Sequence, residues 1–265
     1  MKDTQITPAC LDIINDQINI FDKKATFSDR NEIPDSDKYP LNNPNHWFRI
    51  RNVICVFFDM KNSTKLSADH KPIVVADAYN LFTGTAVRIL NEFEASYIDV
   101  RGDGAFGLFN SFQPHRALAA AVTFKTFADI EFKTQISKIS DVEVGTHIGI
   151  DQRMVLVKKL GIKQSGGRTD RQNEVWAGKP VNMASKLASL SEDGEILVSD
   201  RYHSNFTDEL VLKTCGCPDG VKRDLWVEID FSDNQWFDFV KGFSLGTHWC
   251  EIHGRDYCER ILRLD

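Results

Sequence analysis

The feature that most constrains this 265-residue chain is the unbroken apolar run VICVFF at residues 53–58, which ends directly at Asp59. A run of this length with β-branched and aromatic members predicts a strand buried on both faces. Such a strand needs a covering layer on each side, so the chain has to build a sheet packed by other elements. The carboxylate of Asp59 then stands at the end of a rigid strand.

The segments around this run predict helices and strands in a mixed order. Residues 72–93 place apolar side chains at spacings of three and four behind Pro72, and residues 114–130 form an alanine-rich pattern behind Pro114; both are typical of helices. The other expected elements are strands at 96–100, 105–109, 142–150, 153–158 and 195–198, and helices at 7–22, 180–190 and 200–206. This order predicts an α+β fold with helices packed on a mainly antiparallel sheet.

Changes in composition divide the chain into three expected parts. Residues 1–49 predict a helix and a polar arm that either wraps on another surface or stays loose. Residues 50–209 predict the main domain. Residues 210–265 contain four of the six cysteines and three of the five tryptophans, and we expect a small appended module there.

The overall composition excludes several classes of protein. The net charge of −6 disfavours non-specific nucleic-acid binding, which needs a basic surface. No unbroken apolar run approaches the roughly 20 residues that span a bilayer, and acidic residues interrupt any would-be signal peptide at the N-terminus. The six cysteines are therefore expected to be reduced thiols in a cytoplasmic protein.

Two carboxylates are expected to converge beside the buried strand. Asp103 lies in RGDG, which reads as the turn of a hairpin, and its neighbouring glycines allow close approach of a ligand. If the hairpin neighbours the strand that ends at Asp59, the two aspartates suit Mg²⁺ or Mn²⁺. Taken singly, Asp59 has the alternative role of capping the next turn, and Asp103 that of serving the hairpin.

A third segment adds groups that suit a nucleotide. In VNMASK, Asn182 and Lys186 are four residues apart, so they share one face of the predicted helix. An amide and an ammonium there can hold a ribose oxygen and a phosphate. Taken alone, Lys186 can equally belong to a solvated helix face.

Asp59 in FFDM, Asp103 in RGDG and Asn182 in VNMAS together resemble the core motifs of the class III nucleotide cyclases, over roughly residues 50–207. The resemblance implies a ferredoxin-like catalytic domain that pairs head to tail, so that each active site uses both chains. It also implies that Asp59 and Asp103 bind two Mg²⁺ or Mn²⁺ ions, which activate the ribose 3′-hydroxyl and hold the triphosphate. Asn182 resembles the asparagine that orients the ribose.

Lys186 departs from the family pattern, which usually has an arginine at this position. A lysine supplies the positive charge for the transferring phosphate but not a bidentate fork. Either Lys186 suffices, or Arg168 or Arg171 from the basic loop at 161–173 assists it.

The resemblance also bears on which nucleotide base the site would recognise. Four residues before the second metal aspartate, adenylate-forming members carry lysine and guanylate-forming members glutamate, whereas this sequence has Asp99. An aspartate accepts a hydrogen bond from uracil N3–H, cytosine N4 or guanine N1 but cannot donate to adenine N1, which disfavours ATP. Glu174 stands near the family's second base-reading position. Asp99 has the alternative role of a partly buried acid in the hairpin.

The whole chain resembles the stand-alone pyrimidine cyclases of bacterial antiphage signalling (Pycsar), in which a separate effector reads cyclic UMP or cyclic CMP. The resemblance implies conversion of UTP, or of CTP, to the 3′,5′-cyclic nucleotide and pyrophosphate. Three alternatives remain: a guanylate or adenylate cyclase of ordinary bacterial signalling, a cyclase-like module that binds nucleotide without turnover, and a nucleic-acid module of polymerase-palm type. The acidic balance and the third motif disfavour the last.

The C-terminal part carries soft metal ligands. Cys215 and Cys217 form a CxC pair, and Cys250, His253 and Cys258 follow about 35 residues later. Thiolates with an imidazole suit zinc, and a small module with little core gains stability from a metal. These five residues are candidate zinc ligands; the alternatives are ordinary thiols or an oxidation-sensitive pair.

Overall fold

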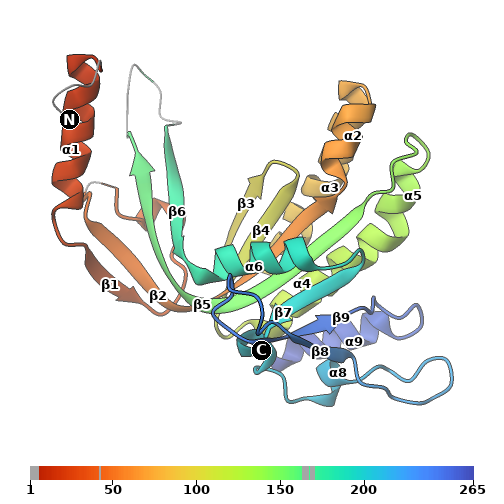
Figure 1. The fold of residues 1–265 in the computed structure, drawn as a ribbon. Coiled ribbons are helices and arrows are strands. Elements are labelled where there is room, and N and C mark those ends of the chain that lie inside the picture. The colour runs from red at the N-terminus through yellow and green to blue at the C-terminus, as the bar shows by residue number, and fades with distance from the viewer. Residues whose placement is uncertain (1–5, 42, 163–166, 168–170) are drawn as a thin grey trace. The chain divides into compact units, whose positions relative to one another are not determined.

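The structure is a computed structural model that describes residues 6–41, 43–162, 167 and 171–265 (Figure 1). It contains two compact units. The larger comprises Asn52–Met154 and Gly178–Asp265, and the smaller comprises Met1–Arg51 and Val155–Ala177. Two long strands, β2 (His46–Lys61) and β5 (Gly145–Gly161), contribute residues to both units.

The larger unit is built on one sheet with the strand order β3-β4-β2-β5-β7-β9-β8. The β2–β4, β3–β4, β7–β9 and β8–β9 pairs are antiparallel, and the β5–β7 pair is parallel. The strands not yet bounded are β3 (Tyr97–Arg101), β4 (Gly104–Asn110), β7 (Glu195–Ser199), β8 (Trp226–Asp230) and β9 (Lys241–Leu245). The mainly antiparallel α+β fold predicted from the sequence is confirmed.

The helices follow the same order along the chain. Helix α3 lies between β2 and β3, and α4 lies between β4 and β5, which gives the β-α-β-β-α-β order of a ferredoxin-like unit. The helices of the larger unit are α2 (Ser63–Asp69), α3 (Pro72–Glu92), α4 (Pro114–Phe127), α5 (Lys133–Ile136), α6 (Lys179–Leu190), α7 (Asp200–His203), α8 (Glu209–Leu212) and α9 (Gly254–Ile261), with a π-helical segment at Ala128–Phe132 and a 3₁₀ turn at Leu262–Leu264. The two strands expected at 142–150 and 153–158 form one continuous strand, β5.

Helices α3 and α4 cover one face of the sheet. Every second residue of β2 from Ile54 to Phe58 is fully buried in the cluster that includes Phe82 of α3 and Phe124 of α4. The ring of Phe124 stacks on Phe58 at 4.1 Å and meets the edge of Phe82 at 5.0 Å. Because Phe124 is fully buried among these rings, replacing it by alanine would cost about 3–5 kcal/mol.

Helix α6 covers the opposite face. In β7 the buried side chains alternate, because Ile196 belongs to the cluster under α3 and α4, whereas Leu197 packs with Leu187 of α6. Gly149 of β5 allows the helix to approach closely, since a Cβ there would lie 2.0 Å from the carbonyl oxygen of Ala184. This packing places α6, with Asn182 and Lys186, on the second face (Figure 1).

Residues 210–265 continue the main sheet, where we expected an appended module. Strand β9 pairs antiparallel with β7, and Ile261 of α9 is buried in the main core. The last residue, Asp265, accepts hydrogen bonds from the backbone N–H groups of His115 and Arg116 at 2.9 and 2.8 Å, at the start of α4. Strand β9 thus covers an otherwise open edge of β7, and the sheet continues across the domain boundary that we expected between residues 209 and 210.

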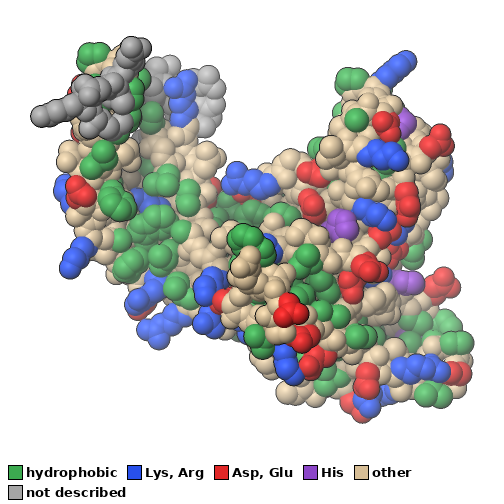
Figure 2. Space-filling model, viewed as in Figure 1, with side chains coloured by type: hydrophobic (Ala, Val, Ile, Leu, Met, Phe, Trp, Pro, Cys, Tyr) green, Lys and Arg blue, Asp and Glu red, His purple; other side chains and the backbone are tan. Residues whose placement is uncertain are grey.

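The smaller unit contains α1 (Pro8–Phe21), β1 (Thr26–Arg30), the 3₁₀ turn Ser36–Lys38 and β6 (Gln172–Gly178), with the adjoining ends of β2 and β5. The expected polar arm includes β1, which pairs in parallel with the first residues of β2. Helix α1 buries none of its side chains and leaves Ile13 and Phe21 exposed, and Figure 2 shows apolar surface in this part of the chain.

Helix α3 has the length and hydropathy of a candidate membrane-spanning helix. Polar residues interrupt it, so no unbroken apolar run in it approaches the length that spans a bilayer, yet an 18-residue window reaches a mean hydropathy of 1.3. By length and composition it is the one helix in the described part of the chain that is long enough and apolar enough to cross a membrane. In the structure its buried face, which includes Ala78, Phe82, Ala86 and Leu90, packs in the core.

Candidate active site

Asp59 and Asp103 lie at the same end of two paired strands. The β2–β4 ladder ends at the pair Phe58 and Ala105, so Asp59 follows opposite the turn that carries Asp103. Gly104 makes this approach possible, because a Cβ there would lie 2.8 Å from the carbonyl oxygen of Phe58 and 3.2 Å from Oδ1 of Asp59. The convergence expected from the sequence is present at the backbone level.

The electrostatics of this corner favour a cation. Burial raises the pKa of Asp59, and the negative charge of Asp103 raises it further, while His147 and the backbone N–H of Met60 act more weakly in the opposite direction. An ionised carboxylate pressed against a second one is stabilised by a divalent ion with oxygen ligands. The two aspartates therefore fit Mg²⁺ or Mn²⁺.

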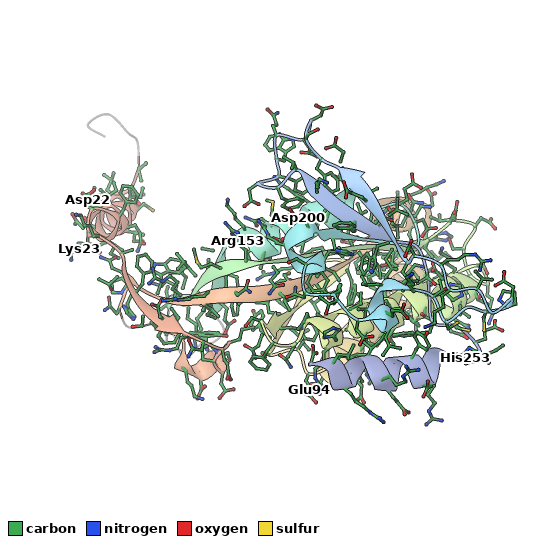
Figure 3. All side chains as sticks on the ribbon, turned by 90° about the horizontal axis from the view of Figure 1, so that it is seen from below. Asp22, Lys23, Glu94, Arg153, Asp200 and His253 are labelled. Carbon is green, nitrogen blue, oxygen red and sulfur yellow. The ribbon has the colours of Figure 1, made fainter. Side chains whose placement is uncertain are left out.

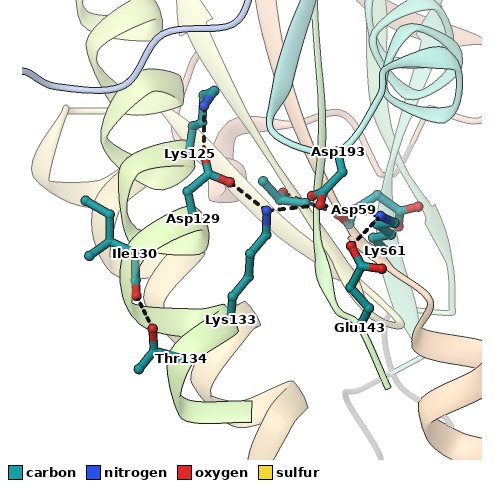
Figure 4. Close-up of polar contacts among 10 residues, drawn as sticks. Asp59, Lys61, Lys125, Asp129, Ile130, Lys133, Thr134, Glu143 and Asp193 are labelled. Carbon is teal, nitrogen blue, oxygen red and sulfur yellow. Dashed lines mark hydrogen bonds and ion pairs between the residues drawn. The ribbon is translucent and has the colours of Figure 1, made fainter. Parts of the chain in front are cut away.

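Neighbouring lysines do not neutralise Asp59. Lys61 lies 3.4 Å from both Glu143 and Asp193, and Lys133 lies 3.0 Å from Asp193, so these cations are committed to other acids (Figure 4). Within the described residues, no ion pair joins Asp59 to a lysine or arginine. Its carboxylate thus remains available to a metal ion.

Asp99 shares the sheet face of Asp59. Asp99 is paired with Phe106, which in turn is paired with Phe57, two residues before Asp59. Directly opposed residues of a sheet point to the same face, as do residues two apart on one strand. This face is opposite the one covered by α3 and α4.

A neighbouring guanidinium occupies one oxygen of Asp99. Arg101 Nη2 lies 2.6 Å from Asp99 Oδ2, while the side chain of Asp99 is 21% exposed and that of Arg101 is 59% exposed. Because the carboxylate of Asp99 is mostly buried, a ligand that displaces Arg101 has to replace it as a partner and not leave the carboxylate unpaired.

Asn182 and Lys186 lie on α6, on that same face. Asn182 is exposed, and the Nζ atom of Lys186 lies 4.8 Å from the centroid of the Trp236 ring. Within the described residues, no hydrogen bond or ion pair joins Asn182 or Lys186 to Asp59 or Asp103. A single chain thus does not tie the two halves of the expected site together.

Trp236 was not foreseen from the sequence, because its loop, residues 231–240, connects β8 and β9. Asp238 anchors the loop by accepting from Lys179 Nζ at 2.7 Å and from Arg201 Nη1 at 3.0 Å. Burial acts to raise the pKa of Asp238, but the bonds from Arg201 and Lys179 outweigh it and lower the pKa to about 2. Arg201 is itself fixed by two bonds, of 2.7 and 2.6 Å, to the buried Asp151.

The remaining candidate ligands for base and phosphate belong to the smaller unit. Glu174 lies on β6, where its Oε1 is 3.5 Å from Nζ of Lys159, and Arg171 is exposed just before that strand. Arg168 lies outside the described residues. The roles expected for these three residues stay predictions.

The fold brings three of the four C-terminal cysteines together and separates the fourth from them. Cys215, Cys217, Cys250 and His253 each offer a ligand atom, and these atoms all lie within 4.8 Å of one another, which is compatible with zinc. Cys258, the fifth candidate, is not a member of this cluster; it lies within α9 and is half-buried against the main core.

Comparison with known proteins identifies the family of this chain. Residues 47–216 match the adenylate and guanylate cyclase catalytic domain family. The chain belongs to the class III nucleotide cyclases. Members of this family generally use divalent metal ions, bind a nucleotide substrate and often dimerise.

Curated relatives of this cyclase extend over most of the chain. A uridylate cyclase of Micromonospora echinofusca is 33% identical over 221 residues, which are 82% of this chain and 71% of that protein. A uridylate cyclase of Propioniciclava tarda is 31% identical over 255 residues, 94% of this chain and 78% of that protein. The match with the second relative thus extends beyond the family's catalytic domain.

Solved structures agree with the cyclase fold. The adenylyl cyclase CyaB from P. aeruginosa superposes with a TM-score of 0.60 at 16% identity, over 74% of this chain and 94% of that one. The guanylyl cyclase Cya2 superposes with a TM-score of 0.56 at 20% identity, over 74% and 92%. The cyclase fold expected from the three motifs is confirmed.

Proposed function

We propose that this cyclase is a uridylate cyclase, which converts UTP to 3′,5′-cyclic UMP and pyrophosphate, with CTP as its second substrate. The observation that carries the choice of base is the position of Asp99, an acceptor on the same sheet face as Asp59. The two relatives named uridylate cyclase support the same choice.

The base follows from hydrogen-bond chemistry. Uracil presents N3–H to a carboxylate, whereas adenine presents only an acceptor at N1. A buried acceptor left without a partner costs about 1–3 kcal/mol, so Asp99 disfavours ATP. A short aspartate on N3–H also leaves both uracil carbonyls free for nearby donors.

The reaction joins the ribose 3′-oxygen to the α-phosphorus and breaks the bond from that phosphorus to the bridging oxygen of pyrophosphate. Asp59 and Asp103 would hold Mg²⁺ or Mn²⁺, which when bound lowers the pKa of the 3′-hydroxyl and offsets negative charge on the triphosphate. Asn182 orients the ribose by hydrogen bonding. Lys186 places its positive charge by the transferring phosphate, without the bidentate geometry of an arginine.

The active site is shared between two copies of the chain. Among the described residues of one chain, no hydrogen bond or ion pair joins Asn182 or Lys186 to the two aspartates, so we infer that a head-to-tail pair supplies the aspartates from one copy and α6 from the other. A symmetric dimer of this kind contains two equivalent sites. The enzyme acts in the cytoplasm, and a separate effector of antiphage defence reads its product.

The test is to incubate the purified protein with each of the four nucleoside triphosphates and Mn²⁺, followed by mass analysis of the products. Cyclic UMP should form fastest, and Asp59→Asn or Asp103→Asn should reduce turnover at least about a hundredfold, because each removes a charged ligand. Glu143→Gln is a matched control, since this acid lies near Asp59 but is 78% exposed and pairs with Lys61. Cyclic AMP as the main product would refute the choice of base, and no product from any nucleotide would favour a binding module without turnover.

A further inference from the structure

The strongest cluster outside the nucleotide site is formed by Cys215, Cys217, Cys250 and His253, whose ligand atoms all lie within 4.8 Å of one another. Cys217 Sγ and His253 Nδ1 are 3.1 Å apart. In a tetrahedral zinc site, bonds of about 2.3 Å to sulfur and 2.0 Å to nitrogen place the ligand atoms of three cysteines and one histidine about 3.5–3.8 Å from each other. The side chains are thus already close to the spacing of a zinc site.

We propose that these four residues bind one structural zinc ion that fastens the start of α9 to the loop before β8. The proposal is independent of the nucleotide specificity. Three cysteines and one histidine complete a tetrahedral set, so no position stays open for a substrate. The site is therefore structural and takes no part in cyclisation.

The backbone at the first two ligands supports this assignment. Gly216, between the two cysteines, has φ = +91°, a conformation that side-chain-bearing residues rarely adopt. The N–H of Gly220 donates to the carbonyl oxygen of Gly216 at 2.6 Å and closes the loop. This tight turn brings Cys215 and Cys217 to one point, which a CxC pair in an extended strand could not do because alternate residues would be held about 6–7 Å apart.

The other two ligands are held by a separate part of the fold. Trp249, next to Cys250, donates its indole N–H to Thr123 of α4 at 2.8 Å. The N–H of Gly254 donates to the carbonyl oxygen of Cys250 at 2.7 Å, and His253 lies at the first turn of α9 (Figure 3). Both pairs of ligands are therefore positioned by hydrogen bonds that do not depend on the metal.

The position of the cluster explains what the ion would stabilise. Asp265 fastens the far end of α9 to the start of α4, so a metal at Cys250 and His253 would fasten the near end. Between the two lies an apolar cavity whose lining includes Leu118, Leu225, Tyr257 and Ile261. A metal joining two segments that flank an incompletely filled core adds its binding free energy to folding.

The first experiment is elemental analysis of the full-length protein, purified without added zinc or chelator. We expect about one zinc per chain. Cys215→Ser, Cys250→Ser and His253→Ala should each lose most of it. Cys258→Ser and His248→Ala are the matched controls: they are a nearby cysteine and histidine outside the cluster, and both should keep the metal.

Replacement of the zinc by Co²⁺ should produce the absorption bands of a tetrahedral cobalt thiolate. A metal-free protein that also gives no cobalt spectrum would overturn the proposal.

The second experiment uses the wild-type chain alone, so that it does not depend on variants that fold. Adding a strong chelator should expose three further thiols to a thiol reagent and lower the melting temperature, and Zn²⁺ should reverse both effects. A disulfide between any two of Cys215, Cys217 and Cys250 in protein purified under reducing conditions would contradict the proposal. So would equal thiol reactivity with and without the chelator.

Discussion

The ammonium of Lys186 lies 4.8 Å from the centroid of the Trp236 ring, across the space between α6 and the β8–β9 loop. Lys186 stands where class III cyclases usually carry an arginine. Its cation is positioned by a tryptophan from a loop that is itself anchored through Asp238 to Lys179 and Arg201. The C-terminal part of the chain thereby reaches the proposed phosphate-binding residue.

Trp236→Leu should lower kcat about two- to fivefold, because a cation–π contact at an exposed site contributes about 0.5–1 kcal/mol. Trp236→Phe keeps an aromatic face and should stay closer to the wild type. Steady-state kinetics with UTP and Mn²⁺ measure the effect, with Val240→Ala, an exposed apolar change in the same loop, as the control. An unchanged kcat in Trp236→Leu would show that the contact does not position Lys186 for turnover.

Asp238→Asn should destabilise the protein in a pH-dependent way. Because the pKa of Asp238 is lowered from 3.8 to about 2, its ion pairs stabilise the fold fully above about pH 4 and less as the pH falls toward 2. Because Asp238 is an exposed residue and solvent screens its ion pairs, the variant should lose only about 1 kcal/mol at pH 7, and about half as much at pH 3. Urea unfolding at the two pH values tests this, and a loss that does not depend on pH would argue against the ion pairs as its cause.

Asp59→Asn should abolish stabilisation by Mn²⁺ without destabilising the metal-free protein. Burial and the charge of Asp103 raise the pKa of Asp59, so the ionised carboxylate is unfavourable when no cation is present, and a neutral amide of equal size relieves that cost at neutral pH. Differential scanning fluorimetry should show a melting temperature that rises with Mn²⁺ for the wild type and Glu143→Gln but stays flat for Asp59→Asn. An equal response of all three proteins would place the metal elsewhere.

Asp99→Ala should flatten the preference among nucleotides more than it lowers the best rate. The wild type is expected to prefer UTP or CTP, then GTP, and ATP last, because a carboxylate accepts from uracil N3–H, cytosine N4 or guanine N1 but cannot donate to adenine N1. Arg101→Ala is the companion variant, since it frees the oxygen that the guanidinium occupies and should preserve the order. The measurement is the rate with each of the four nucleotides under identical conditions for all three proteins. An unchanged ranking in Asp99→Ala would show that Asp99 does not select the base.

A mixture of Asp59→Asn and Lys186→Ala chains should regain activity that neither variant has alone. In a head-to-tail dimer, one of the two sites of a mixed pair contains two intact halves, so the purified mixed dimer should have about half of the wild-type rate. Coexpression with two different tags and purification of the mixed dimer allow the measurement. Complete absence of rescue in verified mixed dimers would mean that each chain builds its own site.

Local sequence patterns were sufficient for the elements that carry the site. The apolar run at 53–58, the helix behind Pro72 and the RGDG turn are short-range features, and the structure contains them as β2, α3 and the β3–β4 hairpin. The convergence of Asp59 with Asp103 was conditional on the hairpin lying beside the strand that ends at Asp59, and the antiparallel pairing of β2 with β4 meets that condition.

Tertiary structure decided what depends on pairing between distant segments. The sequence marks Cys215, Cys217, Cys250, His253 and Cys258 alike, but only the packing of α9 determines that Cys258 turns to the core while the other four meet. The contact of Lys186 with Trp236 requires β9 to join β7, which brings the β8–β9 loop to α6. No local periodicity encodes such contacts, since their free energy arises from surfaces that are buried together only once the whole sheet has formed.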